Sequence, residues 1–171
     1  MLAAASISAP FFRYEVECIA PDGSVRWRDG FTNLVTTVGK TDIVDKYFKG
    51  SAYTAAWFLG LKGTGTAAVG DTLASHAGWA EVNPYTGNRP AITFGTTSGG
   101  SNTATAVSYA INATATAESY TINATATVAG AFVASVNTGT AGTLYSAGDF
   151  AASRSVVSGD TLNVTLTVSA T

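Results

Sequence analysis

The chain has only one histidine, one cysteine and few charged residues in its 171 positions. A single cysteine cannot form an internal disulfide, which excludes a disulfide-stapled secreted scaffold. One histidine and one cysteine are also too few for a His/Cys zinc cluster. Charged residues make up 12% of the chain, about half of the usual share of ~25%. Since hydrophobic residues make up 46%, the low charge does not indicate a disordered chain.

Basic residues are scarce and do not form a stripe. All four lysines lie between Lys40 and Lys62, and the formal net charge is −2. Nucleic-acid binding relies on clustered Lys and Arg to neutralise phosphates, so we expect no nucleic-acid partner. No apolar run approaches the roughly 18 residues of a membrane helix, and residues 1–10 lack the basic region of a signal peptide. We therefore expect no membrane partner and synthesis in a reducing cytoplasm.

The usual sets of catalytic residues are missing from the sequence. His76 is the one available histidine base, and the chain has no Gly-x-Ser-x-Gly motif, so we interpret His76 as a structural hydrogen-bonding residue. Paired carboxylates are not evident, and no Asp-x-Asp run suggests a calcium loop. We predict no enzyme, no catalytic or cofactor-binding residue, no cofactor and no metal site. Turn roles are favoured for the isolated acidic residues Asp71, Glu81, Asp149 and Asp160.

Alternation of apolar and polar residues predicts many short strands. Residues 11–20 and 25–28 alternate around a Pro-Asp-Gly-Ser turn, which predicts a hairpin with opposite charges on its polar face. Residues 53–61 predict a buried central strand, short apolar pieces follow at 143–145, 150 and 156–157, and residues 161–168 alternate most clearly. This pattern is typical of a mainly β protein. We predict a single antiparallel β-sandwich or jelly-roll-like domain over residues 11–171, preceded by an N-terminal arm over residues 1–10.

One short helix is predicted over residues 41–49. Thr41 can cap its N-terminus and Gly50 offers a stop. Because the helix has only about two turns, tertiary packing must hold it. The apolar face expected to provide that packing consists of Ile43, Val44, Tyr47 and Phe48.

The C-terminal half is poor in charge and contains a tandem repeat. Residues 90–171 hold four charged side chains, and residues 108–116 are nearly repeated at 119–127. The period of 11 is odd, so the inward-facing parity switches between the copies and the chain must turn or bulge near Ala117 and Glu118. Two strands joined by a turn are preferred, with a bulged insertion as the alternative. Asn112, Asn123 and Asn163 match the N-glycosylation pattern, but each lies on a predicted polar strand face, and we prefer hydrogen-bonding ladder positions as their explanation.

Aromatic residues leave one binding function open. Trp27, Trp57 and Trp79 have the chemistry of a sugar-stacking platform, although aromatics in β-sandwiches usually fill the core. The core is preferred for Trp57. Trp27 lies between arginines on the predicted hairpin, and for this residue both a core position and a sugar-stacking role stay open. Cys18 shares the parity of inward-facing residues and is interpreted as a small buried hydrophobe.

One further pattern covers nearly the whole chain and lies in residues 14–17, 21–23, 27–38, 44–57, 70–82, 88–91, 122–132, 144–150 and 156–165. In these segments the chain resembles a family of small tailed-bacteriophage virion structural proteins, of the capsid decoration or cement type. The resemblance implies a structural component of the particle. The family pattern has one Ile-Asn-Ala-Thr-Ala-Thr segment, so the second copy here departs from it. No catalytic residue carries over.

The sequence therefore supports two alternative hypotheses for the function. The first is a capsid decoration protein that binds the major capsid protein on the outer surface of the virion, as a homo-dimer or homo-trimer made in the host bacterial cytoplasm. Its arm, residues 1–10, would tether it or exchange strands. The alternative is a tail or head-fibre module that recognises a host surface glycan through loops 83–90 and 96–103 and Trp27.

Overall fold

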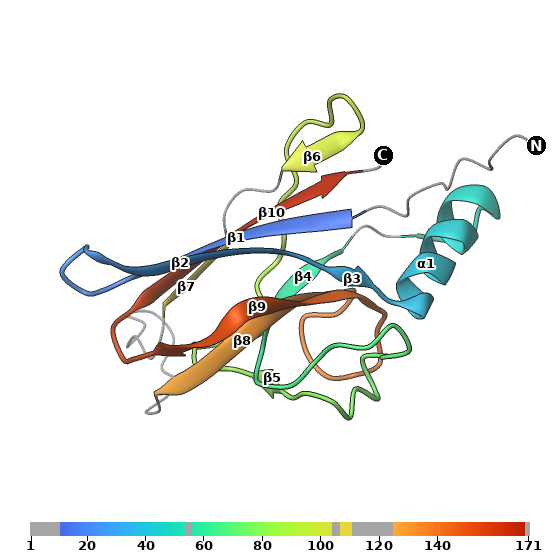
Figure 1. Cartoon of the computed structure of the whole chain (residues 1–171). Helices are drawn as coiled ribbons and strands as arrows, with labels where there is room; N and C mark the ends of the chain where they lie inside the picture. The colour runs from blue at the N-terminus through green and yellow to red at the C-terminus, as the bar shows by residue number, and fades with distance from the viewer. Residues whose placement is uncertain (1–10, 54–55, 104–106, 111–124, 170–171) are drawn as a thin grey trace, which may run out of the picture.

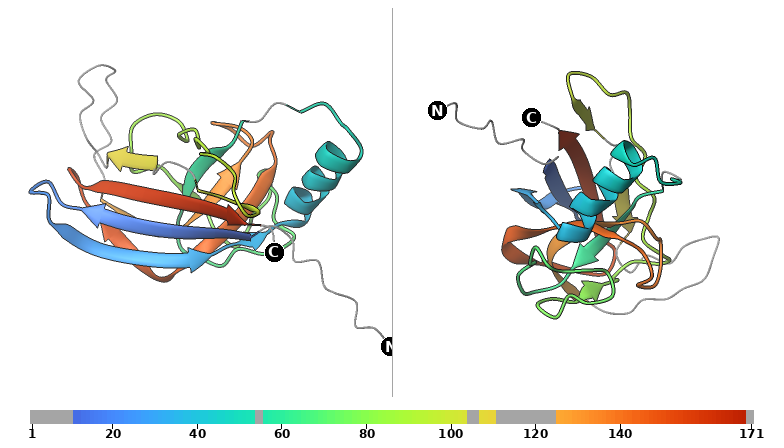
Figure 2. Two further views of the ribbon diagram at one scale, coloured as in Figure 1. Left: turned by 90° about the horizontal axis from the view of Figure 1, so that it is seen from above. Right: turned by 90° about the vertical axis from the view of Figure 1, so that its right-hand side faces the viewer.

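Two antiparallel sheets pack face to face, and one short helical segment lies at one end of the sandwich (Figures 1 and 2). This computed structural model describes residues 11–53, 56–103, 107–110 and 125–169. Strands account for 48% of the structure and helix for 9%. The predicted mainly β fold, an antiparallel sandwich with one short helix, is confirmed.

The first sheet contains the predicted hairpin and the clearest predicted strand. Its order is β2-β1-β10-β6, with β7 also paired to β10. The strands are β1 (Phe11–Ile19), β2 (Val25–Thr32), β6 (Ser101–Thr103), β7 (Val107–Ala110) and β10 (Thr161–Ser169). On the polar face of the hairpin, Arg28 Nε donates to Glu17 Oε1 over 2.7 Å, which is one of the expected cross-strand pairs. Leu162, Val164 and Leu166 are buried as predicted.

The second sheet has the order β3-β9-β8-β4-β5. Its strands are β3 (Leu34–Val35), β4 (Phe58–Lys62), β5 (Glu81–Val82), β8 (Ala126–Ala134) and β9 (Leu144–Val156). The apolar pieces expected at 143–145, 150 and 156–157 belong to one strand, β9. Residues 144–148 are buried irrespective of parity, because both faces of this sheet are covered. A strand covered on both faces lacks the alternation that would identify it.

Two hydrophobic clusters stabilise the sandwich. The larger one lies between the sheets and includes Tyr14 and Cys18, which confirms Cys18 as a buried residue. The smaller one lies on the outer face of the second sheet, where Leu73 and Trp79 from the connection between β4 and β5 cover Phe132. Small side chains of β8 and β9 complete this outer cluster. The second sheet is therefore the middle layer of the molecule in this region.

The helix begins earlier than predicted. It consists of α1 (Thr37–Ile43) followed by a π-helical turn, η1 (Val44–Phe48), and its N-cap is Thr36 instead of Thr41. Thr36 Oγ1 accepts a hydrogen bond from Gly39 N over 3.0 Å and donates to the carbonyl oxygen of Leu144. A Cβ at position 39 would overlap the Tyr145 carbonyl, so Gly39 lets the first turn press against β9. The start of the helix is therefore set by tertiary contact, which local propensity cannot show.

Replacing Thr36 with alanine is expected to lower the free energy of unfolding by about 1–2 kcal/mol, because both the cap and a buried hydrogen bond are lost. Thr41→Ala is the matched control. The Thr41 hydroxyl only donates to Thr37 O on the exposed side of the helix, so its removal should change stability by less than about 0.5 kcal/mol. Urea denaturation followed by circular dichroism measures both. Equal losses in the two variants would refute Thr36 as the cap.

Three sequence-based predictions concern segments outside the described residues. The turn or bulge expected at Ala117 and Glu118 is one of them, since β7 ends at Ala110 and β8 begins at Ala126. The N-terminal arm, residues 1–10, is the second. The third is the polar strand position expected for Asn112 and Asn123, whereas Asn163 lies on β10 opposite Glu17.

Stability is expected to fall at alkaline pH. Burial raises the pKa of Cys18 from 9.0 to about 11, with a further contribution from Asp160, and burial raises the pKa of Tyr14, Tyr85 and Tyr145 above 10. The unfolded chain therefore loses these protons at lower pH than the folded chain, and the free energy of unfolding falls as pH rises through this range. The stabilisation that the Cys18 thiol contributes is fully present below pH 9.

Urea denaturation between pH 8 and pH 11 checks this expectation. Cys18→Ala should flatten the first part of the decline, between about pH 9 and pH 10, because the ordinary thiol titrates before the phenols. Stability that is constant or rising across the range would contradict it.

Candidate functional site

Aromatic side chains of the helical segment are exposed, which corrects the predicted packing of this helix. Ile43 packs against the main core. Tyr47 and Phe48, however, are 81% and 74% exposed, and their rings meet edge to face at 5.0 Å. Both residues lie in η1, where Lys49 N donates to Val44 O, five residues back. Val44, at the start of η1, is 51% exposed as well, so of the predicted apolar face only Ile43 packs on the core.

A groove of about 500 Å³ lies between this helical segment and the ends of the two sheets. Strands of both sheets contribute side chains to it, and so do the connections between η1 and β4 and between β5 and β6. Its lining is mostly apolar and aromatic and comprises Phe12, Ile43, Tyr47, Tyr53, Trp57, Phe94, Val133, Tyr145 and Val168, with Asp42, Lys46 and Thr97 as the polar members.

Ring contacts hold the aromatic walls of the groove in place. Tyr145 meets Phe12 and Trp57 edge to face, each with ring centroids 5.2 Å apart. Trp57 Nε1 donates to Tyr53 Oη over 3.0 Å. Burial, followed by the nearby Asp42 carboxylate, raises the pKa of Tyr145. Trp57 thus packs partly on the core as expected, but it also lines the groove.

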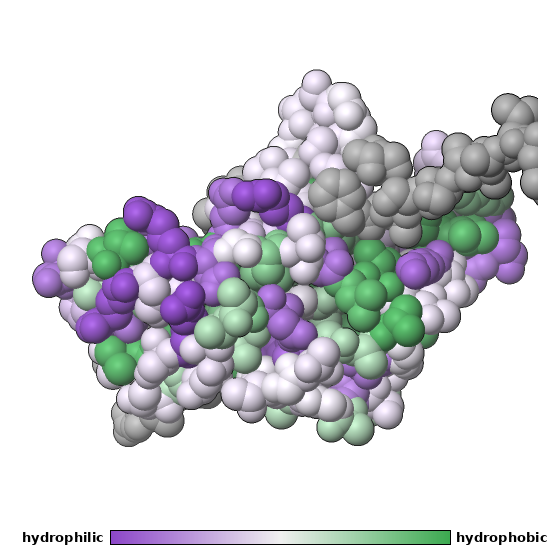
Figure 3. Space-filling view, viewed as in Figure 1, coloured by the Kyte–Doolittle hydropathy of each residue, from purple (hydrophilic) through white to green (hydrophobic). Residues whose placement is uncertain are grey.

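The groove continues into an exposed apolar surface, the aromatic rim, formed by Val44, Tyr47, Phe48 and Tyr53. In the space-filling view, hydrophobic residues reach the surface over the helical segment at the right of the molecule (Figure 3). Isolated exposed apolar residues are ordinary, whereas a contiguous patch marks an interaction site. The rim beside an apolar groove is therefore the strongest candidate for a binding surface in the described part of the chain.

The predicted structural residues of the connection 63–80 contact one another. His76 stacks on Trp79 with ring centroids 4.0 Å apart, and His76 Nδ1 lies 3.0 Å from Trp79 O. Asp71 accepts a hydrogen bond from Trp79 Nε1 over 2.9 Å and another from Ala68 N over 2.9 Å. These contacts fit the structural role expected for His76 and the turn role expected for Asp71.

The other isolated carboxylates each have their own cation. Glu81 binds Arg89 in a bidentate pair, with contacts of 2.8 and 2.6 Å. Asp160 accepts from Arg26 Nε over 2.7 Å and from Val157 N over 3.1 Å. The remaining one, Asp149, pairs with Lys62 at 2.6 Å. Ion pairing, which the sequence did not indicate, is thus a role of all three residues. Asp160 also flanks a turn as expected, whereas Glu81 begins β5 and Asp149 lies within β9, so the turn role expected for those two is wrong.

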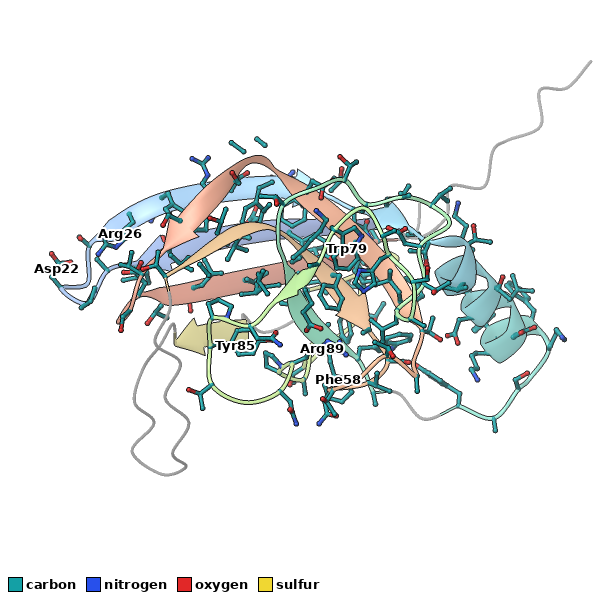
Figure 4. All side chains as sticks on the ribbon, turned by 90° about the horizontal axis from the view of Figure 1, so that it is seen from below. Asp22, Arg26, Phe58, Trp79, Tyr85 and Arg89 are labelled. Carbon is teal, nitrogen blue, oxygen red and sulfur yellow. The ribbon has the colours of Figure 1, made fainter. Side chains whose placement is uncertain are left out.

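Trp27 does not belong to the groove. It packs edge to face on Phe150 at 5.9 Å, lies under the Arg154 guanidinium at 5.8 Å, and donates from Nε1 to Ser155 O. Its neighbour Arg26 lies toward the end of the sandwich that carries the β1–β2 turn, away from the helix (Figure 4). Of the loops singled out for glycan binding, loop 96–103 contributes Thr97 to the groove, and the lining includes no residue of 83–90.

The groove was not predictable from the sequence. Its walls come from positions as far apart as Phe12 and Val168, which become neighbours because β1 and β10 pair along their whole length. The one available signal was the density of aromatic residues between Tyr47 and Trp57, which was predicted to belong to a packed helix face and a buried strand.

The described residues contain no group of three or more His, Cys, Asp or Glu side chains placed to hold a metal ion. Among the same residues, no helix has the length and apolar character needed to cross a membrane. Comparison of the chain with models of known protein families, with curated proteins and with solved structures found no significant match.

Proposed function

We propose that this protein is a structural component of a tailed-phage virion, a capsid decoration protein that docks on the outer shell through the aromatic rim and groove. Its partners would be the major capsid protein and further copies of itself, as a dimer or trimer. The observation that carries the proposal is the exposure of Tyr47 and Phe48 beside an apolar groove. This role requires no catalytic residue, cofactor or metal.

The chemistry of the rim suits a protein partner. Tyr, Trp and Phe are enriched in the cores of protein interfaces, and a few such anchors provide most of the binding energy. The rim carries an ion pair, Lys49–Asp45 at 3.0 Å, so its charges are already balanced and do not repel a neutral partner surface. A protein that binds only the assembled lattice stabilises that lattice by mass action.

Recognition of a host glycan is the second candidate, and the groove supports it better than Trp27 does. Aromatic rings of Tyr53 and Trp57 line the groove beside Asp42, Lys46 and Thr97, and aromatic faces combined with a few polar groups are typical of small-ligand sites. Trp27 already has one face covered by Arg154.

The double variant Tyr47→Ser/Phe48→Ser should weaken binding to purified shells by at least about tenfold, because each anchor is expected to contribute more than about 1 kcal/mol. The double variant Val25→Ser/Val69→Ser is the matched control, since both valines are exposed large hydrophobics outside the groove. Co-sedimentation with shells that lack the protein measures the affinity, and circular dichroism confirms the fold.

Unchanged shell binding by the Tyr47/Phe48 variant would remove the rim from the interface. Absence of any shell binding by the unmodified protein, together with glycan-array binding that Trp57→Ala abolishes, would replace the decoration role with the glycan role.

A further inference from the structure

Lys62, Gly130 and Asp149 form one row across three neighbouring strands. Lys62 of β4 is opposite Gly130 of β8, and Gly130 is opposite Asp149 of β9. Gly130 has no side chain, so the lysine can extend over it to reach a partner two strands away. Lys62 Nζ lies 2.6 Å from Asp149 Oδ1. A Cβ at position 130 would overlap the Gly148 carbonyl, so the close approach of the strands also requires glycine there.

The lysine is enclosed by the outer hydrophobic cluster. Its side chain is 0% exposed, although Lys is among the residues least often fully buried. Nζ lies 5.6 Å from the centroid of the Trp79 ring, which itself packs on Phe132. The Arg89 guanidinium also contacts the Phe132 ring, at 5.3 Å, and Figure 4 shows Trp79 and Arg89. Water is therefore excluded from the amine.

Two backbone carbonyls orient the amine. Lys62 Nζ donates to Gly63 O over 3.1 Å and to Gly65 O. An ammonium group has three protons, and these two acceptors take two of them. This leaves the third proton for the contact with Asp149 Oδ1, which lies 2.6 Å from Nζ.

The contact between the two side chains is close but is not an ordinary hydrogen bond. Asp149 Oδ1 is buried and has no hydrogen-bond partner of acceptable geometry among the described residues, even though Nζ is 2.6 Å away. The other oxygen, Oδ2, accepts from Ala67 N over 3.4 Å. Nζ therefore lies against one carboxylate oxygen, and a backbone donor contacts the other.

We propose that Lys62 and Asp149 join in an intramolecular amide bond, so that the mature protein carries a covalent cross-link between β4 and β9. One proton passes from the ammonium of Lys62 to the carboxylate of Asp149, which leaves a neutral amine and a neutral carboxylic acid. Nζ attacks Cγ, and the C–N bond forms. One carboxyl oxygen then leaves as water with one proton from the carboxyl and one from the amine. No oxidant, reductant or cofactor is consumed.

The site supplies the factors that this condensation needs. Holding an amine and a carboxyl in contact corresponds to an effective molarity of roughly 10⁵–10⁸ M in well-oriented systems. The Lys62 side chain is fully buried, so little water competes with the carboxyl group for the amine. Ala67 N donates to Asp149 Oδ2 over 3.4 Å and polarises that oxygen. This inference is independent of the proposed shell binding, because it concerns a different face of the molecule.

Intact-mass spectrometry of the purified, denatured full chain tests the cross-link. The expected mass is lower by one water than the mass calculated from the sequence. After trypsin digestion, cleavage at Lys62 should be lost, and one branched peptide should join the segment around Lys62 to the segment around Asp149. Full sequence mass in the folded protein after prolonged incubation, with a linear Lys62 peptide, would overturn the proposal without any variant.

Two variants serve as controls, and one other source of water loss must be distinguished from the cross-link. Lys62→Arg keeps the charge but should retain the full mass, and Asp149→Ala should retain its full mass as well. The Asp22–Gly23 sequence can also lose water, by closing to a succinimide. Water loss that persists in either variant, or that maps to Asp22, would assign the mass change to that chemistry and refute the cross-link.

Discussion

Phe132→Ala is expected to lower the free energy of unfolding by about 3–5 kcal/mol. Phe132 is fully buried at the centre of the outer cluster. Its ring contacts Trp79 at 5.3 Å and the Arg89 guanidinium at 5.3 Å, and it covers Gly60, where a Cβ would overlap the ring. Trp79 and Arg89 are themselves held by hydrogen bonds and an ion pair. They cannot collapse into the space left by the ring, so the cavity remains.

Urea denaturation measures this effect, and two further variants calibrate it. Phe132→Leu should lose less, because most of the volume is kept. Val69→Ala, at an exposed position, should stay within about 0.5 kcal/mol of the parent protein. A loss below about 1 kcal/mol for Phe132→Ala would mean that the outer cluster unfolds separately from the rest of the sandwich.

Asp149→Ala is expected to destabilise the protein far more than Lys62→Met, by a difference of about 3 kcal/mol. Removing Asp149 leaves the cation of Lys62, whose side chain is 0% exposed, without its charged partner. Removing Lys62 leaves a carboxylate that is 35% exposed and can still be hydrated. Methionine also fills the volume of the lysine stem beside Trp79. Both variants lose the proposed amide bond alike, so their difference isolates the cost of the unpaired buried cation.

Denaturation curves of the two single variants and of the double variant measure this asymmetry. In the double variant the stability lost in Asp149→Ala should be largely recovered, because no buried charge remains. Equal losses in the two single variants would show that water reaches Lys62 after Asp149 is removed.

The elements that were predictable from the sequence depend on local patterns. β1 alternates buried residues with more exposed ones, β2 alternates half-buried with exposed residues, and β10 alternates buried with half-buried residues. This alternation and the turn at Gly23 identify them. The start of α1 was not predictable, because Thr36 and Gly39 are selected by the carbonyls of Leu144 and Tyr145. The sequence predicted β9 only as separate short pieces, because both of its faces are covered and the alternation is lost.

The candidate sites were largely unpredictable, for a related reason. The sequence shows Tyr47 and Phe48 as an apolar helix face, but no local pattern shows that these two side chains are exposed. Lys62 precedes a glycine-rich segment and would ordinarily be placed at the surface. Its burial depends on Gly130 and Asp149, which are distant in the chain and adjacent only through sheet register.

The antiparallel pairing of β1 with β10 has a practical consequence for protein engineering. Phe11 is opposite Ser169, and the next pair, Phe12 and Val168, lines the groove. Residues 11 and 169 therefore lie beside the groove, and a partner fused close to either of them would compete with a ligand there. The turn between β1 and β2, with Asp22 exposed and Gly23 at φ 84°, lies at the other end of the sandwich (Figure 4). That turn is the better insertion point for a fluorescent label or a displayed peptide, because it leaves the groove accessible.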